Sequence, residues 1–169
     1  MARVRARYAT LLRRLGLYRE AEEAIQRALG EAEDPFTQAR VRSEAGILEA
    51  ARGRPFEALA HLVPAEAYFR TTSERPKEAR YRHLRTLFRL GGAYLLLEAG
   101  QPYRPPFLGG LYAPQAKRLL GNLLEKIPEE PTERYTALRL DAASLLALLL
   151  PPAEARPSSG PSWSWKTPI

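Results

Sequence analysis

The chain has no cysteine and only two histidines, so it holds few of the groups that usually carry out chemistry. The lack of cysteine excludes disulfides, thiolate metal sites and a cysteine nucleophile. The histidines, His61 and His83, lie on different predicted helices, and Glu57 precedes His61 by one helical turn. One histidine and one glutamate fall short of a metal-binding set. We therefore expect no metal, no cofactor and no catalytic residue.

Long apolar runs and nucleotide-binding signatures are also missing. The longest apolar run, 145–150, is too short to cross a bilayer. Arg13 and Arg14 interrupt the N-terminal apolar residues before they reach signal-peptide length. No P-loop, dinucleotide-binding or nucleophile-elbow motif occurs, and we interpret Gly109–Gly110 as a tight turn. These absences favour a cytoplasmic protein that is not an enzyme and has no membrane partner.

What the chain does contain is Leu, Ala, Glu and, above all, Arg. This composition favours helix, and 169 residues suffice for one domain with a core. The net charge is +7, and all but four of the 26 basic residues are arginine. Such a charge fits an acidic partner, either nucleic acid or an anionic protein surface. The explanation that we favour is a GC-rich, thermophile-like genome that uses arginine as its default surface cation.

An internal repeat organises the first seventy residues. Residues of the same kind recur at an offset of 37 positions: Ala9 and Gly46, Gly16 and Gly53, Ala21 and Ala58, Ile25 and Leu62, Ala28 and Ala65. Glycine permits a tight turn, and small residues let two helices approach closely. The spacing resembles the tetratricopeptide repeat (TPR), a helix–turn–helix unit.

The resemblance implies an all-α fold. The expected architecture is a right-handed α-solenoid of about three TPR-like helix–turn–helix units with a C-terminal capping helix, about seven helices in all, within residues 1–150. Prolines break the pattern inside the third unit, so we expect an insertion at about 101–113. An irregular tail rich in Pro, Ser and Trp follows at 151–169.

Several local features predict helix boundaries and faces. Asp34 is expected to cap a helix that begins at Pro35, and Thr72 or Ser73 to cap a long helix from near Glu74. In that long helix, the expected site of close helix approach is Gly92–Ala93. The first helix is expected to turn the following residues inward: Val4, Tyr8, Leu11, Leu12 and Leu15.

The resemblance also implies a concave groove, lined by the first helix of each unit, that binds extended peptides or helices. The positions carried over are Arg3, Thr10, Arg13, Arg40, Ser43, Ile47 and Tyr94. This groove would be basic at one end and apolar at the other. The Lys/Asn set that grips a C-terminal carboxylate in some members is missing. The apolar lining of the third unit fits core residues under the insertion equally well.

A second candidate surface is an arginine-rich face on the long helix. Its residues are Arg75, Arg82, Arg85 and Arg89, the last three at spacings that bring them to one side. Arginine with interleaved aromatics suits phosphate contact and base stacking. A solvated helix face, partly paired with Glu74 and Glu78, would show the same pattern.

The tail offers a third candidate. Trp163 and Trp165 are the only tryptophans, and they alternate with serine as in an extended segment. Buried aromatic anchors dominate the energy of many interfaces. These indoles are expected to dock on the chain's own groove or on that of a second copy, which would give a homodimer.

Two functions of different classes follow from these features. The favoured one is a non-catalytic interaction module that binds a protein partner through its concave helical face. The alternative is a nucleic-acid-associated or transcription-regulatory factor that uses the arginine face, although no helix-turn-helix DNA reader is evident.

Overall fold

The computed structural model describes residues 1–101, 110–130 and 132–149, and all regular structure in these ranges is α-helical. No strand occurs among these residues, which confirms the predicted all-α class. The described ranges contain seven helices: α1 (Ala2–Arg14), α2 (Tyr18–Glu31), α3 (Pro35–Ala51), α4 (Pro55–Thr71), α5 (Pro76–Ala99), α6 (Ala113–Lys126) and α7 (Glu133–Leu149). None of the helices in the described ranges is both long enough and apolar enough to span a bilayer.

The turns at Gly16 and Gly53 have the same geometry. Their φ angles are +78° and +75°, in the left-handed region that glycine adopts without strain. In each turn the glycine N–H donates to the carbonyl three residues earlier, and the next N–H donates to the carbonyl five residues earlier, at 2.9–3.1 Å. This arrangement satisfies carbonyls left free at a helix C-terminus. The two predicted bends are therefore equivalent in the structure.

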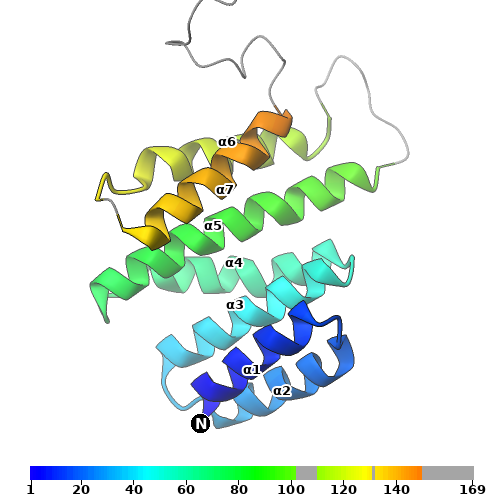
Figure 1. Ribbon diagram of the computed structural model, residues 1–169, viewed down its shortest axis with the longest axis vertical. Helices are drawn as coiled ribbons and strands as arrows, with labels where there is room; N and C mark the ends of the chain where they lie inside the picture. The colour runs from blue at the N-terminus through cyan, green and yellow to red at the C-terminus, as the bar shows by residue number, and fades with distance from the viewer. Residues whose placement is uncertain (102–109, 131, 150–169) are drawn as a thin grey trace, which may run out of the picture.

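The helices form two layers (Figure 1). Each helix packs against the next one along the chain, and contacts also join α1 to α3, α3 to α5, and α5 to α7. These four odd-numbered helices form one layer, turned toward the viewer in Figure 1, with α2 and α6 behind them. We call the surface of this layer the front face.

Two glycines allow the helices to approach closely. A Cβ added at Gly46 would lie 2.6 Å from Leu62 Cγ and 3.1 Å from the Ala58 carbonyl oxygen. A Cβ added at Gly91 would lie 2.9 Å from Leu120 Cδ2. Of the predicted site at Gly92–Ala93, Ala93 is buried in the core, but Gly92 is wrong, because a Cβ there meets nothing within 4 Å.

The predicted inward face of α1 is also wrong. Of its five large apolar residues only Leu12 is buried, while Val4, Tyr8, Leu11 and Leu15 are 56–73% exposed. The face that packs inward is made of Ala2, Ala6 and Ala9. Helical periodicity shows which residues share a side, but not which side a neighbouring helix covers. Here α2 and α3 cover the alanine side.

The long helix α5 begins two residues later than the predicted Glu74. Its first residue is Pro76, and Arg75 precedes it in a left-handed conformation with no side-chain cap. A residue before proline is disfavoured in the right-handed helical region. The helix therefore starts at the proline, and neither Thr72 nor Ser73 caps it.

The predicted cap at Asp34 is present, and its removal gives a first testable expectation. The Thr37 N–H donates to Asp34 Oδ2 at 2.9 Å, and hydrogen bonding from the side chain and then the backbone of Thr37 lowers the pKa of the Asp34 carboxyl. We expect Asp34→Ala to lower the free energy of unfolding by about 1 kcal/mol in a urea titration. The neighbouring exposed Glu33, changed to Ala, serves as the control. Equal stability of the two variants would show that the cap contributes nothing.

Candidate binding site

Three helices bring charged side chains together at the middle of the front face. Arg13 comes from α1, Glu44 from α3, and Arg85 and Arg89 from α5. The Thr10 hydroxyl donates to Glu44 Oε2 at 3.1 Å, and Arg85 Nη2 lies 3.7 Å from Glu44 Oε1. We call Arg13, Arg85 and Arg89 the arginine cluster. Glu44 is buried between them and is their nearest counter-charge.

Two members of the arginine cluster, Arg13 and Arg89, are held where their charge is poorly solvated. Burial lowers the pKa of Arg89 to about 10, and the charges of Arg85 and Arg13 act in the same direction. Burial also lowers the pKa of Arg13, an effect that Glu44 opposes. The Nε atoms of Arg13 and Arg89 are buried, and within the described ranges neither has a hydrogen-bond partner. Glu44 and, at Arg89, Asp141 are the carboxylates that oppose these three guanidinium groups, which leaves a local excess of donors and of positive charge.

A second group of arginines extends the same charge along the front face. Burial lowers the pKa of Arg40 to about 10, and the neighbouring charges of Arg82, Arg7 and Arg3 add to this effect. Glu78 opposes it and forms an ion pair with Arg82 at 2.9 Å. The front face is thus strongly basic across α1, α3 and α5.

An apolar cavity adjoins the arginine cluster. Its volume is about 210 Å³, and its walls include Arg13, Arg89, Ile47, Phe88, Leu96 and Leu145. A second hollow of about 280 Å³, between α5 and α7, shares Phe88 and Arg89 with it and also contains Arg85 and Asp141. Cationic and apolar side chains therefore line both hollows, which meet at Phe88 and Arg89.

The predicted groove residues occupy different places. Arg13 and Ile47 line the cavity, Thr10 holds Glu44, and Arg3 and Arg40 belong to the second arginine group. Ser43 lies half-buried on α3. Tyr94 does not line the cavity, because its ring stacks on Tyr112 at a centroid distance of 6.3 Å.

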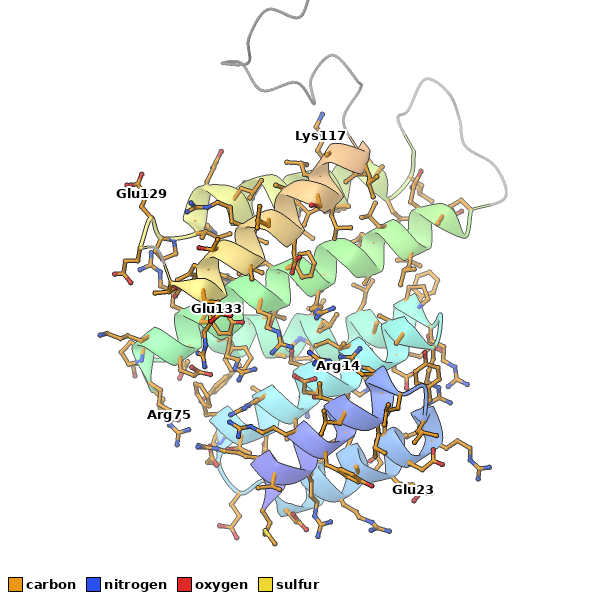
Figure 2. All side chains as sticks on the ribbon, viewed as in Figure 1. Arg14, Glu23, Arg75, Lys117, Glu129 and Glu133 are labelled. Carbon is orange, nitrogen blue, oxygen red and sulfur yellow. The ribbon has the colours of Figure 1, made fainter. Side chains whose placement is uncertain are left out.

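The predicted nucleic-acid residues divide in the same way. Arg82, Arg85 and Arg89 lie on the front face beside the groove residues, so the two predicted surfaces are one. Arg75 projects from the N-terminal end of α5, away from Arg14, as Figure 2 shows. Its guanidinium lies over the Phe36 ring at 5.1 Å. The predicted docking residues Trp163 and Trp165 lie outside the described residues.

Glu44 is the member of this charged cluster that sequence reasoning missed. Its signal was present in the internal repeat, since Glu44 stands 37 residues after Arg7 and reverses the charge at the equivalent position. A single acidic residue among arginines is a candidate counter-ion for them. Only the packing of α1 on α3 and α3 on α5 shows that it is buried among them.

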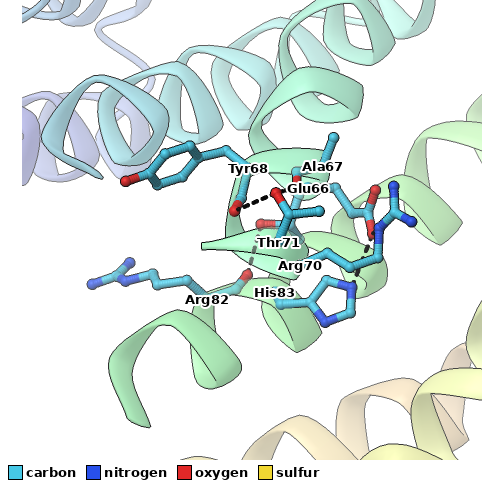
Figure 3. Close-up of polar contacts among 8 residues, drawn as sticks. Glu66, Ala67, Tyr68, Arg70, Thr71, Arg82 and His83 are labelled. Carbon is cyan, nitrogen blue, oxygen red and sulfur yellow. Dashed lines mark hydrogen bonds and ion pairs between the residues drawn. The ribbon is translucent and has the colours of Figure 1, made fainter. Parts of the chain in front are cut away.

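A polar cluster elsewhere in the molecule does not form a metal site. His83 Nε2 lies 2.9 Å from Glu66 Oε1, and Arg70 Nε lies 3.2 Å from the same oxygen (Figure 3). Among the residues that the structure describes, no group of three or more His, Asp or Glu side chains could hold a metal ion. Burial lowers the pKa of His83, and the nearby Lys126 and Arg70 reinforce this, although Glu66 opposes it.

This lowered pKa predicts how stability depends on pH. An unfolded chain protonates His83 at its ordinary pKa of about 6.5, whereas the folded chain takes up that proton only at lower pH. The free energy of unfolding should therefore fall as the pH drops through about 6.5. We expect His83→Gln to flatten the stability profile between about pH 7 and 5.5, in thermal melts. Identical slopes for the two proteins would contradict this assignment.

Comparison with known proteins identifies no relative of this chain. The front-face residues described above are thus assigned from this chain's own geometry. No protein-family model, no curated protein and no solved structure matches the chain significantly.

Proposed function

We propose that this protein is a non-catalytic interaction module that binds an acidic segment of a protein partner on its front face. The observation that carries the proposal is the arginine cluster, with its buried and unpartnered Nε atoms, beside an apolar cavity. Guanidinium groups bind carboxylates through paired hydrogen bonds. A volume of about 210 Å³ is below the usual range for small-molecule sites and suits one apolar side chain of a peptide.

A TPR-like architecture is part of this proposal. In it, α1 to α6 pair into three helix–turn–helix units of a right-handed α-solenoid, α7 caps the stack, and the front face is its concave side. The equal turns at Gly16 and Gly53 support this arrangement, as do the contacts between successive odd-numbered helices. Repeat proteins of this kind use such surfaces for binding.

Nucleic acid is the second candidate, because eight arginines interact electrostatically on this face: Arg3, Arg7, Arg13, Arg14, Arg40, Arg82, Arg85 and Arg89. Base recognition on such a surface also calls for free aromatic faces. Tyr81 instead packs against Tyr135 at 5.9 Å and has Arg134 over its ring at 5.0 Å. Phe88 has the Arg89 guanidinium 5.4 Å from its centroid. The occupied rings favour an acidic protein segment.

The proposal is tested with a fluorescent peptide of Glu residues around one central Leu. Anisotropy should detect binding that weakens at least about thirtyfold in the double variant Arg85→Glu/Arg89→Glu, since charge reversal leaves buried like charges facing the peptide. Arg19→Glu/Arg27→Glu is the matched control, because both residues are exposed on α2 and the change in net charge is the same.

The same assay separates the two candidate partners. Replacing the central Leu by Ser should weaken peptide binding, because the apolar cavity is then left unfilled. A single-stranded oligonucleotide that binds more tightly than the peptide, with an affinity falling steeply between low and moderate salt, would favour the nucleic-acid alternative. Equal losses in the two double variants would contradict a site on the front face.

A further inference from the structure

A line of exposed apolar side chains runs along α1, on a different side from the front-face site. Val4, Tyr8, Leu11 and Leu15 follow one another at spacings of three or four residues. All four are more than half exposed. We call these four residues the apolar stripe. Scattered apolar residues are ordinary on a surface, but a continuous line of large ones is typical of an interaction surface.

The internal repeat shows what covers the equivalent line one unit later. At the offset of 37 residues, Val4, Tyr8 and Leu11 correspond to Val41, Ala45 and Leu48 of α3. Those three residues are buried in a cluster with residues of α2: Ala21, Ala24, Ile25 and Ala28. The apolar stripe therefore presents to solvent the surface that, in the next unit, packs against a preceding helix.

The charges that border the apolar stripe differ on its two sides. On the side toward α2, Arg5 Nε is paired with Glu31 Oε1 at 2.7 Å. On the side toward the front face, about a quarter turn around the helix, lie Arg3, Arg7 and Arg14. These three are exposed, and no carboxylate within the described part of the chain forms an ion pair with them. One border is thus neutralised and the other is positively charged.

We infer that the apolar stripe is the docking surface for an amphipathic helix of another protein, with acidic residues along one border of its apolar side. A helix fits because its backbone groups are satisfied internally, whereas the side-chain surface of α1 offers no partners to an extended strand. The acidic border is assigned by the unpaired Arg3, Arg7 and Arg14. Residues 150–169 do not supply this charge, because they contain one acidic and two basic residues.

A second copy of the chain is a poorer match for this surface. If two copies paired their α1 helices antiparallel about a two-fold axis, the edge carrying Arg3, Arg7 and Arg14 would face the same edge of the partner. Like charges that meet across an interface oppose association. The net charge of +7 on each copy acts in the same direction.

The inference is tested with two labelled synthetic peptides that form amphipathic helices. Both carry Leu at helical spacing, bordered by Glu in one and by Lys in the other. We expect the Glu-bordered peptide to bind the full-length chain and the Lys-bordered one to bind at least about tenfold more weakly. In Tyr8→Glu/Leu11→Glu, the affinity for the Glu-bordered peptide should fall at least about tenfold. Circular dichroism would verify that each variant is folded.

Matched variants make the result specific to this surface. Leu140→Glu/Leu148→Glu changes two exposed leucines of α7, at the opposite end of the molecule, and should leave the affinity unchanged. Arg3→Glu/Arg7→Glu/Arg14→Glu should reverse the preference in favour of the Lys-bordered peptide.

Three outcomes would overturn the inference. In the first, both peptides bind equally well, so that charge plays no part. In the second, the α7 control weakens binding as much as the α1 variant does. In the third, sedimentation shows a dimer of the full-length chain that Leu11→Glu dissociates, so that a second copy is the occupant.

Discussion

Replacing Gly46 by Leu is expected to lower the free energy of unfolding by about 3 kcal/mol or more, because the seam between α3 and α4 has no room for a side chain. Even a Cβ would lie 2.6 Å from Leu62 Cγ, and the Ala58 carbonyl oxygen blocks the other direction. The helices must then separate along a core that includes Ala58 and Leu62. Urea or thermal unfolding measures the loss.

A control and a rescue make this result specific. Gly30→Leu places the same side chain on exposed helix surface, where a Cβ meets nothing within 4 Å, and should be neutral or stabilising. Leu62→Ala alone should cost about 2–5 kcal/mol. In the Gly46→Ala background the same truncation should cost less, since the two residues are in contact. If the losses of stability from Gly46→Ala and Leu62→Ala simply added, the close packing of these two residues between α3 and α4 would be contradicted.

Replacing Glu44 by Gln is expected to lower the free energy of unfolding by about 3 kcal/mol. The amide keeps the shape of the side chain, and its oxygen can still accept the Thr10 hydrogen bond, but the charge is lost and an NH2 donor replaces the oxygen that faces Arg85. Without the charge, Arg13 and Arg85 lose their buried counter-charge, and only Asp141 still opposes the positive charge at Arg89. Removing one member of a buried ion pair is costly for this reason.

The measurement is a urea titration at moderate salt. Glu23→Gln, on the exposed surface of α2, is the control and should change stability by less than about 0.5 kcal/mol. High salt should reduce the loss caused by Glu44→Gln, because ions screen the remaining repulsion between arginines. A loss as small as that of the control would mean that Glu44 is not the counter-ion.

The parts of the fold that the sequence predicts are those that depend on single residues. Gly16 and Gly53 take φ angles that disfavour other residues, so their spacing predicts two equivalent turns. Gly46 and its partner Leu62 stand at predicted positions in the repeat, and Asp34 caps the predicted helix. In each case, local backbone or packing requirements select the residue type.

The parts that the sequence does not predict depend on which helix covers which. Val4 and Leu11 of α1 have the periodicity of a buried face, yet lie exposed because none of the helices in the described part of the chain occupies that side. Choosing between Gly91 and Gly92 requires knowing the rotation of α5 against Leu120. A sequence pattern shows which residues share one side of a helix, but it does not show which neighbouring helix packs against that side.

The candidate site illustrates the same limit. Arg82, Arg85 and Arg89 are visible in the sequence as a basic face, and Arg13 and Ile47 follow from the resemblance to a repeat family. Their convergence around one buried carboxylate required the packing of α1, α3 and α5. From the sequence alone, these residues belong to two alternative surfaces. In the fold, the two surfaces are parts of the same face.

We propose that the front face holds guanidinium groups in poorly solvated positions where they bind an anionic partner. The most direct test compares Arg89→Met with the unchanged protein in two measurements: the free energy of unfolding and the affinity for the Glu-rich peptide. We predict a variant at least as stable as the original, because a buried charge is exchanged for an apolar side chain, with affinity reduced at least about tenfold. A variant that is less stable and binds the peptide unchanged would contradict the account.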